Sequence, residues 1–214
     1  MKYKVTFLLD KTNTWFEKYL KNYNFNLNNK YLFKISKNPN KIVKQDLVFP
    51  LSYTKILSKE FIKKNKLILI VHASKLPKDK GFAPVQNQIL KNKKKIHVSL
   101  IKAEKDKEVD SGAIYLTDVF SLADTDLSPE IRLKQGKAVL KIIKKFLVKY
   151  PKVKCIEQKG RGNFNKRRKP ADSELNINKS IKSQFNLLRI CDNEKYPSFF
   201  KYKKHKYILK IYKE

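Results

Sequence analysis

The sequence predicts an α/β fold in which helices flank a mostly parallel β-sheet, and two observations support this. Short apolar runs alternate with segments of helical periodicity over the first 150 residues. This order is typical of β–α–β units with right-handed crossovers. The run LILIV at 67–71 is apolar at every position, as expected for a strand buried on both faces of a parallel sheet.

Seven segments have the composition of strands. They are 4–9, 31–35, 46–51, 67–71, 95–101, 113–116 and 207–212. Pro50 has to lie near the end of its strand, because proline cannot donate a hydrogen bond within a central ladder. The last strand would close the chain.

Four segments have helical periodicity: 14–20, 54–64, 128–150 and 178–187. The third is the clearest, because Ser128 offers an N-cap, Pro129 suits the first turn and Glu130 complements the positive end of the helix dipole. Tyr150-Pro151 ends it. The composition then changes to a basic, glycine-containing stretch at 159–170. We therefore expect a main domain over 1–150 and a short C-terminal extension over 151–214.

Charge is the most unusual property of the composition. The 214 residues carry 50 Lys and Arg against 19 Asp and Glu, a formal net charge of +31. Nucleic-acid binding is the obvious interpretation. However, 45 of the basic residues are Lys and only 5 are Arg, alongside 17 Asn. Base readout favours Arg, whereas an A-rich coding bias favours Lys and Asn, so we expect no nucleic-acid partner. Such a field would still attract anionic small substrates.

Several other classes of protein are disfavoured. At 41% hydrophobic residues the chain can bury a core. Its apolar runs are shorter than the roughly 20 residues that span a bilayer. Cys155 and Cys191 lack the spacing of a disulfide framework or a zinc site. We expect a soluble, cytoplasmic protein that needs no metal.

One histidine and one aspartate are the candidates for chemistry. His72 follows the apolar strand and begins a loop that contains Pro77, Gly81 and Pro84, while Asp110 precedes a glycine at the mouth of a later strand. If the two strands are neighbours, the carboxylate can orient the imidazole and raise its basicity. The alternative is that the histidine is structural and the Asp-Ser-Gly tripeptide is only a turn.

The motifs favour the first interpretation, because together they resemble a known family. HASKLP at 72–77, KGFAP at 80–84 and DSG at 110–112 are similar to the signature of the formyltransferases that depend on N10-formyltetrahydrofolate. The resemblance covers roughly residues 4–212 and is closest to the short sugar-nucleotide N-formyltransferases. It implies a Rossmann-like formyltransferase fold, with 1–150 as the catalytic domain and 151–214 as an extension that completes the acceptor site.

The resemblance also implies site residues. His72 and Asp110 would be catalytic, with His72 in proton transfer and Asp110 either orienting it or relaying the proton. The folate would lie against the segment 49–53 and the loop 104–110. The implied folate-binding residues are Phe49, Pro50, Leu51, Ser52, Tyr53 and Asp106. Loop positions that could bind the acceptor are Lys78, Lys80, Gly81, Arg161, Arg168 and Lys169. Trp15 could stack on a pterin or a base, or could simply pack.

One position departs from the family pattern. Many relatives have an asparagine two residues before the histidine, where it helps to hold the oxyanion, but here that residue is Ile70. Three explanations stay open. His72 and backbone N–H groups could hold the oxyanion, another polar residue could have taken over, or the protein could be an inactive relative.

The function that follows is transfer of a formyl group to the primary amine of a nucleotide-linked 4-amino-4,6-dideoxy sugar. Such an enzyme would act in bacterial O-antigen, capsule or flagellar glycan biosynthesis, and the resemblance also allows a homodimer. An amine linked to transfer RNA or to an amino acid is the main rival acceptor, although the length leaves no room for the second domain of a transfer-RNA formyltransferase. The alternative from a different class is a basic nucleic-acid-binding protein.

Overall fold

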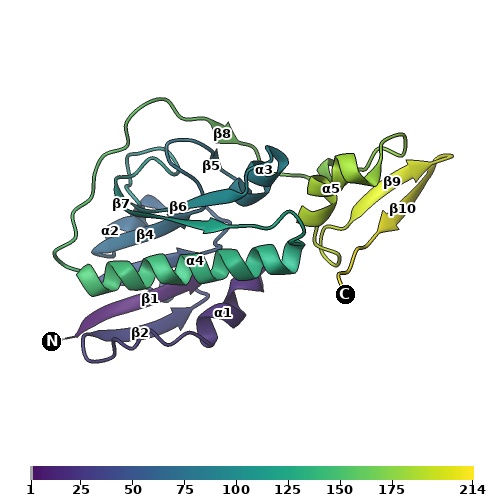
Figure 1. Cartoon of the computed structure of the whole chain (residues 1–214). Coiled ribbons are helices and arrows are strands. Elements are labelled where there is room, and N and C mark those ends of the chain that lie inside the picture. The colour runs from purple at the N-terminus through teal and green to yellow at the C-terminus, as the bar shows by residue number, and fades with distance from the viewer. Residues whose placement is uncertain (1) are drawn as a thin grey trace.

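The computed structural model describes residues 2–214, and its centre is a six-stranded sheet with helices on both faces (Figure 1). The strands lie in the order β2-β1-β3-β4-β6-β7. Their bounds are β1 Tyr3–Leu9, β2 Tyr31–Ser36, β3 Leu47–Leu51, β4 Leu67–His72, β6 Lys95–Lys102 and β7 Ile114–Ser121. The first four are parallel, while β6 and β7 are antiparallel additions. The predicted α/β fold with a mostly parallel sheet is thus confirmed.

Strand β4 lies between β3 and β6 and pairs with each of them over a different part of its length. Its first two residues, Leu67 and Ile68, pair in parallel with β3, and the stretch from Leu69 to His72 pairs antiparallel with β6. Beyond Val48, where the pairing with β4 ends, β3 still pairs with β1, and Pro50 lies opposite Leu8. Pro50 occupies the next-to-last position of β3, as its missing N–H requires.

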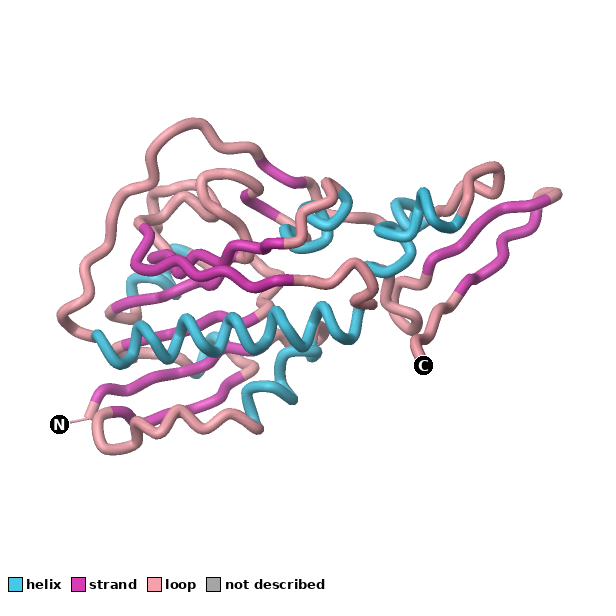
Figure 2. Tube along the Cα trace, viewed as in Figure 1, coloured by secondary structure: helices cyan, strands magenta, loops and turns pink. Residues whose placement is uncertain are grey.

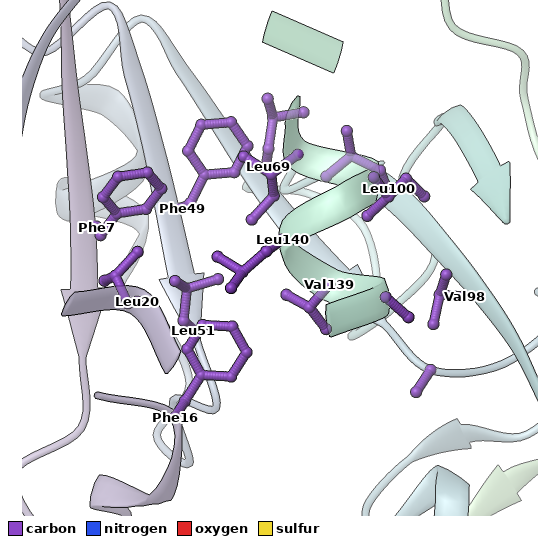
Figure 3. Close-up of a cluster of buried hydrophobic side chains, with 14 of the residues drawn as sticks. Phe7, Phe16, Leu20, Phe49, Leu51, Leu69, Val98, Leu100, Val139 and Leu140 are labelled. Carbon is purple, nitrogen blue, oxygen red and sulfur yellow. The ribbon is translucent and has the colours of Figure 1, made fainter. Parts of the chain in front are cut away.

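Alternating side chains of the strands fill two hydrophobic clusters, one on each face of the sheet. Phe7, Phe49 and Leu69 belong to the larger cluster, which α4 (Ser128–Lys149) covers with Val139 and Leu140 (Figure 3). An adjacent residue on each of these strands points to the opposite face. Leu8 and Val48 pack there with Ile68 and with Phe61 of α2 (Lys59–Lys63). This alternation is the period-two pattern of strands buried on both faces.

The long helix α4 matches the predicted range, but its start differs by one residue. Leu127 takes the N-cap position, and its backbone N–H donates to the Glu130 carboxylate at 2.8 Å. Ser128 is thus the first helical residue and not the cap, whereas Glu130 binds the exposed helix start as expected. Neither α4 nor any shorter helix within residues 2–214 has the length and apolar character to cross a membrane.

The predicted helix at 54–64 is much shorter than expected. The Ser58 hydroxyl accepts a hydrogen bond from the Phe61 N–H and so begins α2 only at Lys59. Upstream, both the N–H and the hydroxyl of Thr54 are bound to the Asp10 carboxylate. These bonds hold residues 54–58 in a loop, because the local carboxylate competes with helical pairing.

The remaining elements lie at the rim of the sheet and beyond it (Figure 2). They are η1 Thr14–Phe16, α1 Glu17–Lys21, η2 Pro39–Lys41, β5 Lys80–Gly81, α3 Pro84–Leu90, β8 Phe164–Asn165, η3 Pro170–Ser173, α5 Ile181–Ile190, β9 Ser198–Tyr202 and β10 His205–Leu209. The expected helix at 178–187 starts later because Ser180 caps it. The expected last strand at 207–212 pairs at 205–209, where the β9–β10 hairpin projects from the body (Figure 1).

The packing of α4 sets a prediction for stability. Ile143 is fully buried on the sheet side of α4, and Val148 on the same helix is 59% exposed. We expect Ile143→Ala to lower the free energy of unfolding by about 2–5 kcal/mol, through lost burial and the cavity left behind. Val148→Ala should change it by less than about 0.5 kcal/mol. Urea unfolding followed by circular dichroism measures both, and equal losses would contradict the packing described.

Candidate active site

A cavity of about 560 Å³ opens where β3 and β4 part at their carboxyl ends. Its walls are formed by residues within the segments 13–16, 50–62, 70–73, 81–86, 101–112 and 132–139. His72 and Asp110 both line it. The end of the parallel strands is where α/β folds usually place a ligand.

The structure brings the predicted pair together. Nδ1 of His72 lies 3.3 Å from Oδ2 of Asp110, and both side chains are more than nine-tenths buried. On the other side of the ring, Nε2 of His72 lies 2.8 Å from the backbone carbonyl of Asp79. Because a carbonyl oxygen only accepts, Nε2 carries the proton of that hydrogen bond.

This arrangement has a chemical consequence for the pair. With Nε2 protonated, Nδ1 of His72 and Oδ2 of Asp110 face each other, and neither atom has a proton of its own in the neutral imidazole and ionised carboxylate. A proton held between them relieves the clash of two acceptors. The two atoms are therefore placed to share a proton, and Oδ1 of Asp110 receives no hydrogen bond from the residues described.

The loop after β4 holds the aspartate from its other side. The backbone N–H of Gly81 donates to Oδ2 of Asp110 at 2.9 Å. Gly81 has a φ of +85°, and a Cβ there would come within 2.6 Å of the Asn165 carbonyl, so this position requires glycine. Asp110 itself has a φ of +59°, a left-handed conformation that a non-glycine residue adopts at an energetic cost.

A second buried aspartate fastens two loops of the cavity wall. Oδ1 of Asp10 accepts from the N–H and hydroxyl of Thr12, each at 2.8 Å, and Oδ2 accepts from the N–H and hydroxyl of Thr54 at 2.9 and 2.6 Å. Asn13 donates through its amide to the Ser52 carbonyl. Burial alone would raise the pKa of Asp10, but the hydrogen bonds from Thr54 and Thr12 outweigh it and lower the pKa well below its usual value.

The residues expected to bind folate separate into two groups. Four of them, Pro50, Leu51, Ser52 and Tyr53, line the cavity. Phe49 does not, because its ring is fully buried beneath the sheet beside Phe7. Asp106 lies outside the cavity wall and is 67% exposed, with Lys59 and Lys105 as its ion-pair partners.

Few of the residues expected to bind the acceptor lie in the cavity. Gly81 lines it, and the Lys80 ammonium donates to the Ser111 hydroxyl beside Asp110. The other four, Lys78, Arg161, Arg168 and Lys169, lie outside the lining residues. The Arg168 guanidinium instead donates to the Asp172 carbonyl at 2.7 Å, which braces its own loop.

Two arginines that the sequence analysis did not select lie at the cavity. Arg132 lines it, near Trp15 and ion-paired to Asp192 at 2.8 Å. Arg167 lies over the Phe82 ring at 4.5 Å and donates to the Thr54 carbonyl. Their rarity was a usable signal, because a coding bias that favours Lys does not explain the five arginines in the chain.

The position that departs from the family motif also faces the cavity. Ile70 is among the lining residues, two positions before His72 on β4. An apolar side chain therefore stands where relatives with the resembling motif have an amide. Polar side chains that line the cavity include His72 and Asp110 and the amides of Asn13, Gln86 and Gln135.

The fold and this site define a class of protein: an α/β protein with a buried histidine–aspartate pair in a cavity at the end of its parallel strands. The model of the formyl transferase family matches residues 11–147, more than half of the chain. The chain belongs to this family, and the resemblance predicted from the motifs is confirmed.

Known proteins similar to this chain carry more than one acceptor in their names. A methionyl-tRNA formyltransferase from Fusobacterium nucleatum is 32% identical over 148 residues, which are 67% of this chain and 47% of that protein. The chain thus spans less than half the length of this curated relative.

Solved structures similar in fold include a methionyl-tRNA formyltransferase from Clostridium thermocellum, with a TM-score of 0.81, 23% identity and coverage of 95% and 90% of the two chains. A sugar N-formyltransferase from Shewanella has a TM-score of 0.74, 16% identity and coverage of 99% and 98%. HypX from Aquifex aeolicus in complex with tetrahydrofolic acid has a TM-score of 0.73 and 17% identity, over 99% of this chain and 38% of that one.

The Asp10 network predicts how stability depends on pH. Because the pKa of Asp10 is lowered in the folded protein, its contribution to stability is complete above the unfolded value of about 3.9 and is lost as pH falls below it. We expect Asp10→Asn to destabilise the protein at pH 7 and to flatten the loss of stability between about pH 5 and pH 2. Asp106→Asn, at an exposed position, is the control. Thermal unfolding at several pH values measures this, and an unchanged acid profile in Asp10→Asn would contradict the assignment.

Proposed function

We propose that the protein is an N-formyltransferase that moves the formyl group of N10-formyltetrahydrofolate to a primary amine. The observation that carries the proposal is the 3.3 Å approach of His72 to Asp110 at the wall of a large cavity. Membership of the formyl transferase family supports it, and the tetrahydrofolic acid complex of a protein of similar fold supports the donor.

The cavity has the chemistry that a folate needs. Leu51, Ile70 and Ile101 supply apolar surface for the faces of a flat ring, and the loop 104–110 supplies backbone groups for its polar edge. When bound, the folate supplies the formyl group. We place its ring between 50–53 and 104–110, without Phe49 and Asp106, whose side chains do not line the cavity.

The two catalytic residues supply proton transfer and charge. An amine attacks only when neutral, so a base has to take its proton as the new bond forms. In this structure both nitrogens of His72 are engaged, which makes Oδ1 of Asp110 the acceptor that faces the cavity without a partner. The pair with its shared proton is neutral overall, because the charges of an imidazolium and a carboxylate cancel. Once Oδ1 has taken the amine proton, the pair carries one positive charge, which stabilises the oxyanion. The pair then passes a proton to the departing nitrogen and becomes neutral again.

We propose a nucleotide-linked 4-amino-4,6-dideoxy sugar as the acceptor, as in the assembly of a bacterial surface glycan. The cationic side chains along the cavity suit a diphosphate. They are Lys55, Lys59, Lys102, Lys105, Lys107 and Arg132. The likeness in fold to a sugar N-formyltransferase over 98% of its chain supports this choice. The 32% identity to a methionyl-tRNA formyltransferase favours a methionine attached to transfer RNA as the second candidate.

An acceptor panel distinguishes these candidates. The protein is incubated with N10-formyltetrahydrofolate and with dTDP-, UDP- and GDP-linked 4-amino sugars, methionyl-tRNA or free amino acids, and the mass of each product is measured. Formylation of one sugar nucleotide is the expected result. Formylation of methionyl-tRNA alone would overturn the sugar acceptor and keep the transferase, and no product with any amine would overturn the transferase.

Substitution of the catalytic pair is the test of the mechanism. We expect His72→Ala to lower kcat by about 10²-fold or more, the usual scale for general acid–base groups. Asp110→Asn removes the charge at nearly constant size, so it should lower kcat and leave folate affinity within a few fold. His205→Ala, at an exposed position outside the cavity, is the control. Normal turnover in both variants of the pair would rule out the proposed roles.

Ile70→Asn tests how the oxyanion is held. If His72 and backbone groups already support it, an added amide gives no gain and destabilises the protein by about 1–3 kcal/mol for any part left unpaired. If the oxyanion lacks support, the same change raises kcat. We expect no gain in kcat, because the charge on the His72–Asp110 pair already stabilises the oxyanion. Initial rates and thermal unfolding decide the matter, and a kcat above that of the parent would show that Ile70 limits the reaction.

A further inference from the structure

The chain after α4 returns across the candidate site as an extended segment, residues 156–165, which we call the strap (Figure 1). Ile156 pairs with Ile114, next to the loop that carries Asp110. At the other end, Phe164 and Asn165 form β8, which pairs with Lys80 and Gly81 of β5. The strap therefore touches both segments that contribute to the catalytic pair.

The middle of the strap holds the loop after β4. Asn163 accepts from the Asp79 N–H at 2.9 Å and donates its amide to the Asp79 carboxylate at 3.2 Å. The Asp79 carbonyl is the partner of His72 Nε2. A Cβ at Gly162 would come within 2.2 Å of the Pro77 carbonyl, so the strap lies directly against this loop.

Gln158 of the strap holds the loop of the catalytic aspartate. Its Nε2 donates two hydrogen bonds of 2.8 Å, one to the carbonyl of Asp110 and one to that of Gly112. The first carbonyl belongs to the left-handed residue itself, and the second lies two residues further along the turn. One amide nitrogen thus joins Asp110 to the end of the turn that follows it, and a left-handed conformation at a non-glycine residue requires such support from its surroundings.

The oxygen of the Gln158 side-chain amide shows why the amide has this orientation. Oε1 is buried and has no hydrogen-bond partner within residues 2–214. Reversing the amide would turn this oxygen toward two carbonyl oxygens, which also only accept. The observed orientation satisfies the Asp110 turn and leaves the Gln158 oxygen unpaired, an arrangement that costs stability.

The turn sets the direction of the carboxylate. From its left-handed backbone, the Asp110 side chain reaches the Gly81 N–H and Nδ1 of His72 together. A relaxed turn would move Oδ2 relative to both groups, and rates depend on such displacements, because a misplacement of about 1 Å can cost 10²-fold. Gln158 thereby acts on the reacting groups without touching the cavity, of which it is not a lining residue.

We infer that Gln158 is a positioning residue, which holds the backbone of Asp110 so that its carboxylate meets His72. The expected effect on kcat rests on the proposed function. The expected effect on the position of the Asp110 carboxylate rests on the geometry of the turn alone. It assigns to the segment beyond residue 150 a part in the transfer step itself.

The test compares Gln158→Met, which keeps the length of the side chain and removes the amide, with the parent. We expect kcat to fall about 10- to 100-fold, with KM for folate and acceptor within a few fold. The kcat of Gln158→Glu should be lower still, because the introduced carboxylate repels the two carbonyl oxygens. Gln184→Met is the matched control, since the Gln184 amide also bridges backbone groups, at Asn176 and Lys179, in a segment away from the cavity.

A second readout does not require activity. The chain has three histidines, so the ring resonances of His72 can be resolved from those of His97 and His205 by NMR. Gln158→Met should shift the His72 nitrogen resonances and leave the other two in place. Normal kcat per folded molecule together with unmoved His72 resonances would overturn the inference. Should Gln158→Met fail to fold, Gln158→Ala, which admits water to the two carbonyls, provides the same comparison.

The two proposals fail in different ways. If the parent transfers no formyl group to any amine, the proposed function is wrong, and shifted His72 resonances in Gln158→Met still support the positioning role. If the parent is active and Gln158→Met matches it in kcat and in the His72 resonances, only the positioning role is wrong.

Discussion

The separation of β3 from β4 is the constraint on which the site depends. Leu67 and Ile68 pair with β3 on one edge of β4, and the four residues that follow pair with β6 on the other edge. Because β3 and β4 stop pairing after Ile68, a space opens between their carboxyl ends, and the cavity occupies that space. His72 ends β4 at the wall of this space. The core beneath is tightly packed on both faces, so the opening lies on a rigid support.

Buried acids organise this site within a strongly basic chain. Asp10, Asp79 and Asp110 are each more than nine-tenths buried, and each accepts hydrogen bonds or ion pairs that fasten a loop. Burial alone would raise the pKa of Asp79, but hydrogen bonds from Lys91 and Asn163 lower it. Most lysines have no comparable role in the site, which agrees with a compositional origin of the net charge. The loops of the site are instead fastened by a few carboxylates, whose partners are backbone N–H groups, hydroxyls, amides and two lysines at Asp79.

The sequence contained the parts of the site that depend on local pattern. The helix at 128–149 could be predicted from its periodicity. The proximity of His72 and Asp110 could be predicted from their motifs, which place both residues at strand ends. Phe49 was wrongly expected at the cavity, because its ring packs in the core. Leu51 shares the face of Phe49 but lies at the end of β3, and it does line the cavity. The distance of a residue from the end of the strand therefore decides which of them reaches the cavity, and local pattern does not show where the cavity begins. The helix expected at 54–64 failed because a distant carboxylate, Asp10, binds Thr54.

Long-range contacts of single side chains left no pattern in the sequence. Arg167 and Gln158 reach Thr54 and Asp110 across 113 and 48 residues, and nothing in their own neighbourhoods indicates these partners. The extension expected over 151–214 was assigned to the acceptor, yet the contacts of 156–165 are made to the loops of the catalytic pair.

These contacts join the two expected regions at the site. A chain ending near residue 150 would lose β8, Asn163 and Gln158 together, and with them the pairing of β5 and the support of the Asp110 turn. The sheet and α4 lie within the first 150 residues and carry most of the buried apolar side chains, so such a chain would keep its core and lose the geometry of the site. The His72–Asp110 pair is thus held from both parts of the sequence, by Gly81 and Asp79 of the first 150 residues and by Gln158 and Asn163 of the strap.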